Sequence, residues 1–179
     1  MHPILPLSAL GRRIMINGPS NAGKSTLADA ISRKLGVPAI HLDLFSHLPN
    51  TDWEPRNTKE FHALHEAAIL DEEWVMDGNY SAIMPQRYAR ATGVIIIDDH
   101  FLKRYFRYFR RTLFESNRVG SVAGGRDSIK WEMIAFIWKS RNAGKYRQMA
   151  AGYDLPVVIC NSLGELQQLY AAWSLERRR

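Results

Sequence analysis

Long apolar runs are missing from this sequence of 179 residues. None approaches the roughly 20 residues that a membrane-spanning helix needs. The first residues, 1–7, also lack a basic region followed by a long apolar one, which is the pattern of a secretory signal. We therefore expect a cytoplasmic protein that does not bind membranes.

Cysteine and metal-binding patterns are equally scarce. Cys160 is the only cysteine, so an internal disulfide is excluded, and its place at the end of the apolar run 157–159 predicts burial as a small hydrophobic residue. His62 and His65 are three residues apart on an expected helix, but no cysteine or third histidine accompanies them at a metal-binding spacing. The sequence predicts no zinc site.

No internal repeat, low-complexity tract or proline-rich linker divides the chain. With 46% hydrophobic and 23% charged residues, the composition predicts one globular domain over residues 1–179.

Two segments are long enough to cover a site: 46–58, which is polar, and 116–128, which is rich in glycine. Trp53 in the first segment could stack on a substrate ring or anchor the loop.

A glycine-rich stretch fits the phosphate-binding pattern G-x-x-x-x-G-K-[ST] and follows the apolar run 14–16. The glycines let backbone N–H groups surround the β-phosphate, Lys24 reaches the β- and γ-phosphate oxygens, and the Ser25 hydroxyl can coordinate Mg²⁺. The helix that follows adds the positive end of its dipole. The expected nucleotide-binding residues are Gly18, Pro19, Ser20, Asn21, Ala22, Gly23, Lys24, Ser25 and Thr26. This stretch predicts a nucleoside triphosphate site.

Short apolar runs alternate with helical patterns along the whole chain. The expected strands are 14–16, 39–42, 74–76, 94–97 and 157–159. The expected helices are 27–35, 61–70, 83–88, 102–113, 131–138 and 166–173. Such alternation predicts an α/β fold with a parallel sheet and helices on both faces.

Carboxylates follow three of the expected strands, at the sheet edge where ligands collect. They are Asp43, Asp77 and the pair Asp98 and Asp99. A carboxylate there can hold Mg²⁺ through water, accept a proton from an attacking hydroxyl, or cap the next helix. We expect functional roles for Asp43 and Asp77. For Asp98 and Asp99, a functional role and a helix cap both remain open.

Basic residues form a second set of candidates. On the helix 102–113, Arg104, Arg107 and Arg111 share one face, which is either a solvated surface or a clamp on phosphates. If the helix 131–138 continues, Arg141 and Lys145 fall on its apolar stripe. Their charges then need a phosphate or a buried carboxylate as a partner, or the side chains extend over the edge of the stripe into solvent. Arg126 lies in the glycine-rich segment as a further candidate.

Together with the phosphate loop, the segment Trp74–Tyr80, Arg87 and the arginine-rich helix resemble the adenylate-kinase-like P-loop proteins sometimes labelled DNA topology modulation proteins. More distantly, the chain is similar to nucleoside monophosphate, shikimate and gluconate kinases. The resemblance covers nearly the whole chain. It implies a three-layer P-loop fold with a five-stranded parallel sheet of order 2-3-1-4-5, a substrate-side segment at about 43–70 and a lid at about 112–147.

The same resemblance implies roles for particular residues. Lys24 and Ser25 take the phosphate and Mg²⁺ roles, Asp77 assists the metal, and Arg107, Arg141 or a neighbour closes from the lid. The sequence does not contain the acceptor-recognition pattern of any one of these kinases. It therefore predicts neither the acceptor nor the choice between ATP and GTP.

Three functions remain in competition. The first is a Mg²⁺-ATP-dependent phosphotransferase acting on a small acceptor, with Asp43 orienting or deprotonating that acceptor. The second is a nucleotide-binding regulator that contacts nucleic acid, favoured by the net charge of +6 and the tail 177–179. No nucleic-acid-binding motif supports it. The third is an ATPase without an acceptor, which lacks a recognisable residue to position water. The oligomeric state is not predicted.

Overall fold

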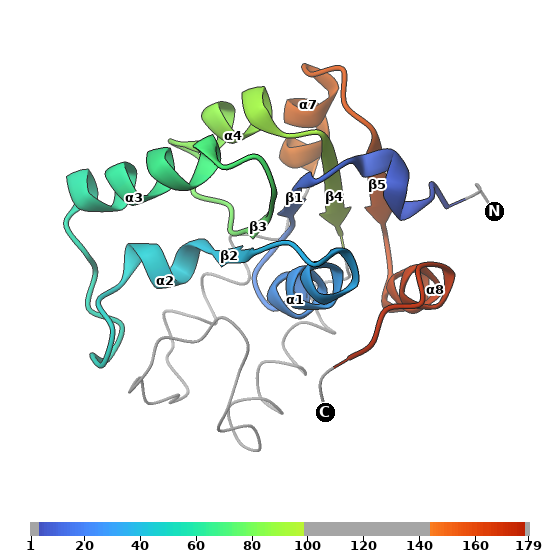
Figure 1. The fold of residues 1–179 in the computed structure, drawn as a ribbon, viewed down its shortest axis with the longest axis horizontal. Coiled ribbons are helices and arrows are strands. Elements are labelled where there is room, and N and C mark those ends of the chain that lie inside the picture. Colours follow the sequence, from blue (N-terminus) through green and yellow to red (C-terminus); the bar gives the residue numbers. More distant parts are fainter. Residues whose placement is uncertain (1–3, 99–143, 178–179) are drawn as a thin grey trace.

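The computed structural model describes residues 4–98 and 144–177. Five parallel strands form one sheet of order β2-β3-β1-β4-β5 (Figure 1). The strands are β1 (Arg13–Asn17), β2 (Ala39–His41), β3 (Trp74–Asp77), β4 (Gly93–Ile97) and β5 (Val157–Cys160). The strand order that the family resemblance implies is confirmed, and each of the short apolar runs is a strand of this sheet.

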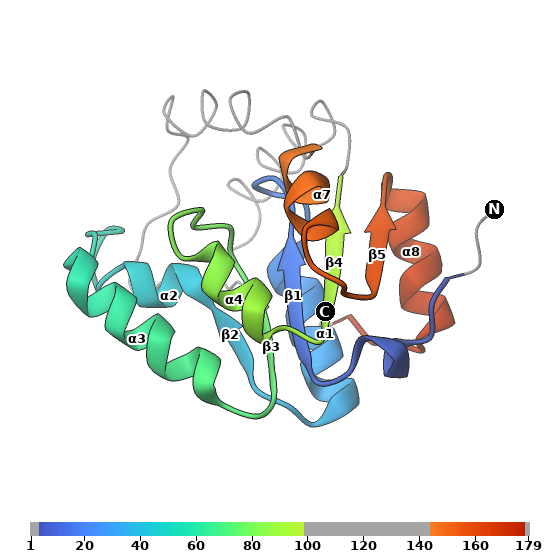
Figure 2. The same cartoon turned by 90° about the horizontal axis from the view of Figure 1, so that it is seen from above.

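Helices cover both faces of the sheet. They are η1 (Leu7–Leu10), α1 (Lys24–Leu35), α2 (Leu42–Ser46), α3 (Thr58–Leu70), α4 (Met84–Arg90), α7 (Gly144–Ala151) and α8 (Leu163–Ala172). Figures 1 and 2 show α1 and α8 on one side of the sheet and α4 and α7 on the other. The predicted three-layer architecture is therefore confirmed.

Two separate cores result from the alternation of side chains along the strands. Ile14 and Ile16 of β1 pack with α1 and α8, whereas Met15 between them packs with α3, α4 and α7. Cys160 belongs to the first core, and burial raises the pKa of its thiol to about 12. The expectation that this cysteine is a buried hydrophobic residue is confirmed.

The structure differs from the sequence prediction after β2. The strand ends at His41, and Leu42 begins the short helix α2, so Asp43 lies in the first turn of a helix rather than at a strand end. Leu42 is completely buried, and a carboxylate in a first helical turn suits the helix dipole. The expected substrate-side segment 43–70 thus contains most of α2 and all of α3, while most of the expected lid 112–147 lies outside the described residues. The expected helices 102–113 and 131–138 also lie outside them.

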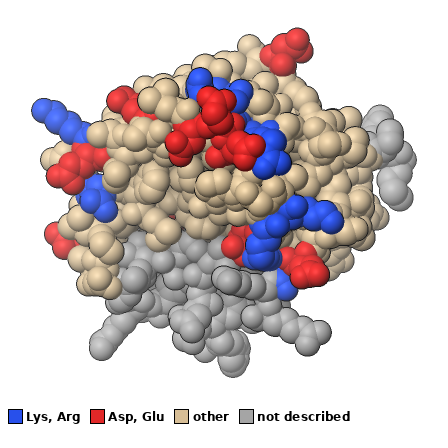
Figure 3. All heavy atoms as spheres, viewed as in Figure 1, with Lys and Arg blue, Asp and Glu red and all other residues tan. Residues whose placement is uncertain are grey.

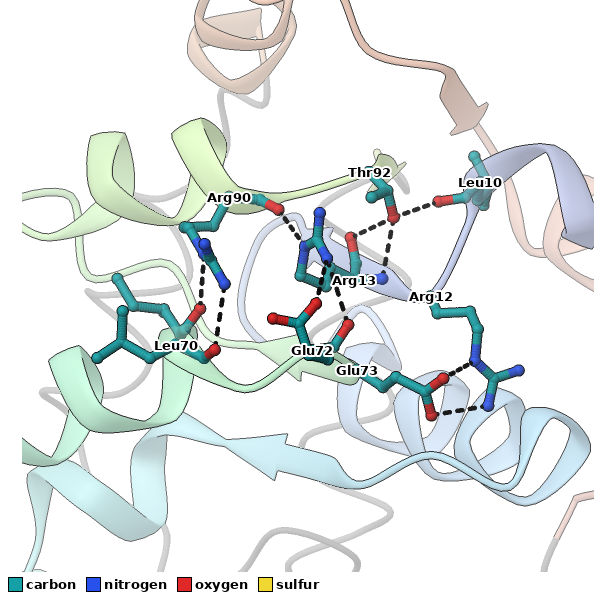
Figure 4. Close-up of polar contacts among 9 residues, drawn as sticks. Leu10, Arg12, Arg13, Leu70, Glu72, Glu73, Arg90 and Thr92 are labelled. Atoms are coloured by element: carbon teal, nitrogen blue, oxygen red, sulfur yellow. Dashed lines mark hydrogen bonds and ion pairs between the residues drawn. The ribbon is translucent and has the colours of Figure 1, made fainter.

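At the edge of the sheet where the strands begin, polar side chains form hydrogen bonds and ion pairs between neighbouring segments (Figure 4). The guanidinium of Arg12 pairs with Glu73, that of Arg13 donates to the Arg90 carbonyl, and Thr92 Oγ1 donates to the Leu10 carbonyl at 2.8 Å. The Arg12–Glu73 pair is exposed, so it adds little stability. These contacts mainly satisfy backbone groups, and they lie at the edge opposite the phosphate loop.

His65 on α3 is one of the few buried polar residues that the structure describes. Its side chain is completely buried, and neither ring nitrogen has a hydrogen-bond partner within residues 4–98 and 144–177. Burial lowers the pKa of His65 to about 4, and the neighbouring charges of Arg87 and His62 act in the same direction. The folded protein therefore keeps this imidazole neutral.

This burial predicts a pH dependence of stability. In the unfolded chain His65 binds a proton below about pH 6.5, whereas in the folded protein it does so only near pH 4. Between these two pH values this residue should lower the free energy of unfolding by about 3 kcal/mol. Urea denaturation at pH 7, 5.5 and 4.5 measures it. His65→Phe should show a smaller loss than wild type, and His62→Phe is the matched control. Equal pH slopes in wild type and His65→Phe would contradict the assignment.

Candidate functional site

The loop between β1 and α1 has a backbone that only its own glycines allow. Gly18 has φ +147°, and a Cβ at this position would lie 2.3 Å from the Ile97 carbonyl oxygen. Gly23 caps α1 with φ +91°. Lys24 Nζ donates to the Pro19 carbonyl at 2.9 Å, so the ammonium lies over the loop. The two glycines of the pattern therefore allow the backbone conformation of this loop at the end of β1.

Asp77 lies at the centre of the polar contacts at this edge. Ser25 Oγ donates to one carboxylate oxygen at 2.7 Å, and His41 Nδ1 lies 2.5 Å from the other. Parallel pairing produces this arrangement, since Asp77 on β3 is in register with His41 on β2 and with Ile16 on β1. The Asp77 side chain is buried as a result.

The contact with Asp77 controls the ionisation of His41. Burial opposes protonation of the ring, but the hydrogen bond and charge of Asp77 outweigh it, and Asp29 and Asp43 add to the effect, so the pKa of His41 is raised. A raised folded-state pKa stabilises the protein fully below pH 6.5, and this stabilisation is lost as the pH rises through the folded value.

The turn that follows β3 connects Asp77 with the expected substrate-side segment. Gly78 has φ +117°, and a Cβ there would lie 2.8 Å from the Leu42 Cβ. Asn79 bonds to the backbone of Gly18, and the Tyr80 hydroxyl donates to Asp43 Oδ1 at 2.7 Å. Burial, together with the charge of Asp43, raises the pKa of Tyr80, so its hydroxyl remains a donor.

Arg87 on α4 lies directly behind this turn. Its guanidinium is completely buried and donates to the carbonyl oxygens of Gly78 at 2.6 Å and Asn79 at 2.5 Å. Burial lowers the pKa of Arg87 to about 10, although Tyr88, Asp77 and Tyr80 oppose the change. The side chain is therefore still a cation at neutral pH.

Two further candidates lie near one another in the fold: Asp98 directly follows β4, and Lys145 is in α7, which packs against β4. Arg147 Nη2 donates to Asp98 Oδ2 at 2.9 Å and to Asn161 Oδ1 at 2.5 Å, so Asp98 is held by an arginine that lies outside the predicted site residues. Lys145 is exposed, with Nζ 4.9 Å from the centre of the buried Tyr146 ring. Its expected lid role stays a prediction.

The fold brings Lys24, Ser25 and Asp77 together, and Tyr80 links Asp43 to the same turn. The other lid candidates lie outside the described residues: Arg104, Arg107, Arg111, Arg126 and Arg141. His41, which contacts Asp77, is not among the residues predicted for the site, although it ends a strand two residues before Asp43. Arg147 had no comparable signal.

The donor atoms around Asp77 suit a magnesium ion. A serine hydroxyl and a carboxylate are hard oxygen ligands, and Mg²⁺ in kinase sites is usually held by one or two carboxylates together with substrate phosphates. Within the described part of the chain no group of three or more His, Cys, Asp or Glu residues could hold a metal alone. A site shared with a nucleotide fits these residues better than an all-protein cage.

Removing the Asp77 charge should change the titration of its neighbour. In Asp77→Asn, burial still lowers the pKa of His41, but the carboxylate that raises it is lost, so this pKa should fall by about one pH unit or more relative to wild type. Two-dimensional NMR of the imidazole resonances measures the change. Asp71→Asn, at the end of α3, removes the same charge elsewhere and is the control; it should leave the pKa of His41 unchanged. An unchanged His41 pKa in Asp77→Asn would contradict the contact.

Solved structures with the same fold include two small-molecule kinases. A shikimate kinase from Bacteroides thetaiotaomicron superimposes with a TM-score of 0.52 at 19% identity, over 90% of this chain and 98% of that one. A gluconokinase from Sinorhizobium meliloti 1021 superimposes with a TM-score of 0.57 at 13% identity, over 92% of this chain and 91% of that one. At such identities the likeness establishes the fold.

No curated protein matches the sequence. No helix within residues 4–98 and 144–177 has the length and apolar character to span a membrane. The model of the AAA domain family matches residues 14–114, which is more than half of the chain and includes the phosphate loop, Asp43, Asp77 and Arg87. The chain therefore belongs to the AAA domain family, and it shares the fold of the shikimate kinase and the gluconokinase.

Proposed function

We propose that this protein is a Mg²⁺-ATP-dependent phosphotransferase that acts on a small hydroxylated or phosphorylated acceptor. One observation carries the proposal: a single turn, 77–80, contacts Ser25 of the phosphate loop at one end and Asp43 of the substrate side at the other. Phosphoryl transfer requires that donor and acceptor be held together in this way. Two of the solved structures with the same fold are a shikimate kinase and a gluconokinase, which supports a phosphotransferase acting on a small molecule.

The donor side consists of the loop and Lys24. Loop residues 18–23 and the first turn of α1 present backbone N–H groups, and α1 adds its dipole. Lys24 Nζ, which donates to a loop carbonyl, would exchange that acceptor for phosphate oxygens. Ser25 and Asp77 would hold Mg²⁺, which neutralises charge on the phosphates when it is bound.

The acceptor side is built on α2 and the Tyr80 hydroxyl. Asp43 is exposed, so an acceptor from solvent can reach its carboxylate, while Tyr80 holds one of its oxygens in place. In the proposed reaction Asp43 orients the acceptor hydroxyl or removes its proton. Arg107 and Arg141 remain the proposed lid residues, with Arg104, Arg111, Arg126 and Lys145 as further candidates.

The charge distribution gives the nucleic-acid alternative no specific support. Residues 99–143 hold ten of the 24 Lys and Arg residues but only four of the 18 Asp and Glu residues, so the basic excess is concentrated there. On the face in Figure 3, basic and acidic side chains of the described residues lie next to one another instead of forming a basic stripe. A concentrated basic segment suits a lid over several phosphates equally well.

The first test concerns nucleotide binding. Lys24→Ala should fold normally but lose the stabilisation that ATP gives, because a cation that touches two phosphates is removed while the loop backbone remains. Thermal melting with and without MgATP measures the effect. Lys34→Ala, an exposed lysine in the last turn of the same helix, is the control. An ATP-dependent melting shift in Lys24→Ala equal to that of wild type would refute the loop assignment.

The second test concerns turnover. A metabolite library screened for ATP consumption should identify an acceptor, and with that acceptor Asp77→Asn should keep nucleotide binding but lose at least about a hundredfold in kcat. Asp71→Asn should retain full activity. If Asp77→Asn turns over normally with unchanged Mg²⁺ dependence, the carboxylate only supports the structure. An ATPase without an acceptor would consume ATP equally in all wells.

A further inference from the structure

Gly18, the first residue of the phosphate loop, is held by a side chain from another part of the chain. Asn79 Nδ2 donates to the Gly18 carbonyl at 2.8 Å, and the Gly18 N–H donates to Asn79 Oδ1 at 3.3 Å. The primary amide thus satisfies both backbone groups of one residue, as a neighbouring strand would. On its other side, Gly18 lies against the Ile97 carbonyl of β4. The start of the loop is fixed from two directions.

The turn that carries Asn79 is itself fixed by Arg87. The two terminal nitrogens of the guanidinium donate to successive carbonyls, those of Gly78 and Asn79. No carboxylate within residues 4–98 and 144–177 forms an ion pair with Arg87. Burying a guanidinium in this way is costly, and it persists only where its hydrogen bonds are well placed.

We propose that Arg87 and Asn79 act as positioning residues for the phosphate loop. Arg87 orients the turn 78–79, and the Asn79 amide transmits that orientation to Gly18, so the loop amides already point correctly before nucleotide arrives. The proposal rests on the proposed function, because it assigns these residues to nucleotide binding. Neither side chain touches the reacting atoms.

The arrangement explains why an asparagine and an arginine occupy these positions. An aspartate at 79 would accept from the Gly18 N–H but place a carboxylate oxygen against the Gly18 carbonyl. A lysine at 87 has one nitrogen on a flexible stem and cannot match two adjacent carbonyls with the planar fork of a guanidinium. Both substitutions keep polarity while removing the geometry, which makes them informative.

The same turn also connects the loop with the acceptor side. Tyr80 follows Asn79 directly, has φ +33° although it is not glycine, and donates to Asp43. Backbone strain of this kind persists only where surrounding contacts enforce it. Weakening the Arg87 contacts should therefore disturb both the nucleotide and the acceptor, whereas loss of the Asn79 amide should disturb mainly the nucleotide.

The first experiment compares Asn79→Asp with Asn57→Asp. Asn57 caps α3 by accepting from the Lys59 N–H, which aspartate also does, so this control adds the same charge without losing a contact. Asn79→Asp should weaken MgATP binding at least about tenfold by calorimetry and accelerate amide exchange in residues 18–25 of the free protein. Asn57→Asp should match wild type in both readouts.

The second experiment compares Arg87→Lys with Arg90→Lys on the same helix. Arg90 also donates to two successive carbonyls, those of Ile69 and Leu70, but at the opposite edge of the sheet. Arg87→Lys should accelerate exchange at the loop and raise both the Kd for MgATP and the KM for the acceptor. Arg90→Lys should change melting temperature without a specific effect on nucleotide.

The outcomes separate this proposal from the proposed function. If wild type binds no MgATP, the function fails, and amide exchange in the free protein still tests the positioning role. If wild type binds MgATP and folded Asn79→Asp matches it in affinity and loop exchange, the positioning role is refuted. Should Arg87→Lys fail to fold, Asn79→Asp, whose side chain is only half-buried, decides the question alone.

Discussion

The contacts of the turn 77–80 are the constraint on which the rest of the site depends. Each residue of this turn reaches a different partner: Asp77 contacts Ser25 and His41, Gly78 packs on Leu42, Asn79 bonds to Gly18, and Tyr80 bonds to Asp43. Since β3 lies between β1 and β2, its end is the natural place to join the phosphate loop with the substrate-side helices. Strand order therefore determines the site.

The site also contains several features that by themselves lower the stability of the fold. Gly18, Gly78 and Tyr80 have positive φ, and Arg87 is a buried cation whose guanidinium donates to two backbone carbonyls. Strain and buried charge concentrate where a protein holds groups in place for a ligand. The core on either side, which is apolar and alternates regularly along the strands, supplies the stability that tolerates them.

The sequence predicted those parts of the molecule that depend on local pattern. Buried strands, the glycine loop and the helices after it follow from apolar periodicity and from turn residues. The strand order is not a local pattern: it was expected from the family resemblance, and the sheet confirms it. Asp43 was placed at a strand end and lies in a helix instead, because a three-residue strand gives too short a pattern to locate its end. Contacts such as His41 with Asp77, or Arg147 with Asp98, join residues 36 and 49 positions apart and depend on which strands are neighbours.

A crystal structure with a non-hydrolysable ATP analogue and Mn²⁺, located by its anomalous signal, tests the central claim most directly. Our account predicts the triphosphate against residues 18–25, the manganese peak beside Ser25 and Asp77, and an unaltered contact between Asn79 and Gly18. A nucleotide bound elsewhere, or a metal peak remote from Asp77, would contradict the account.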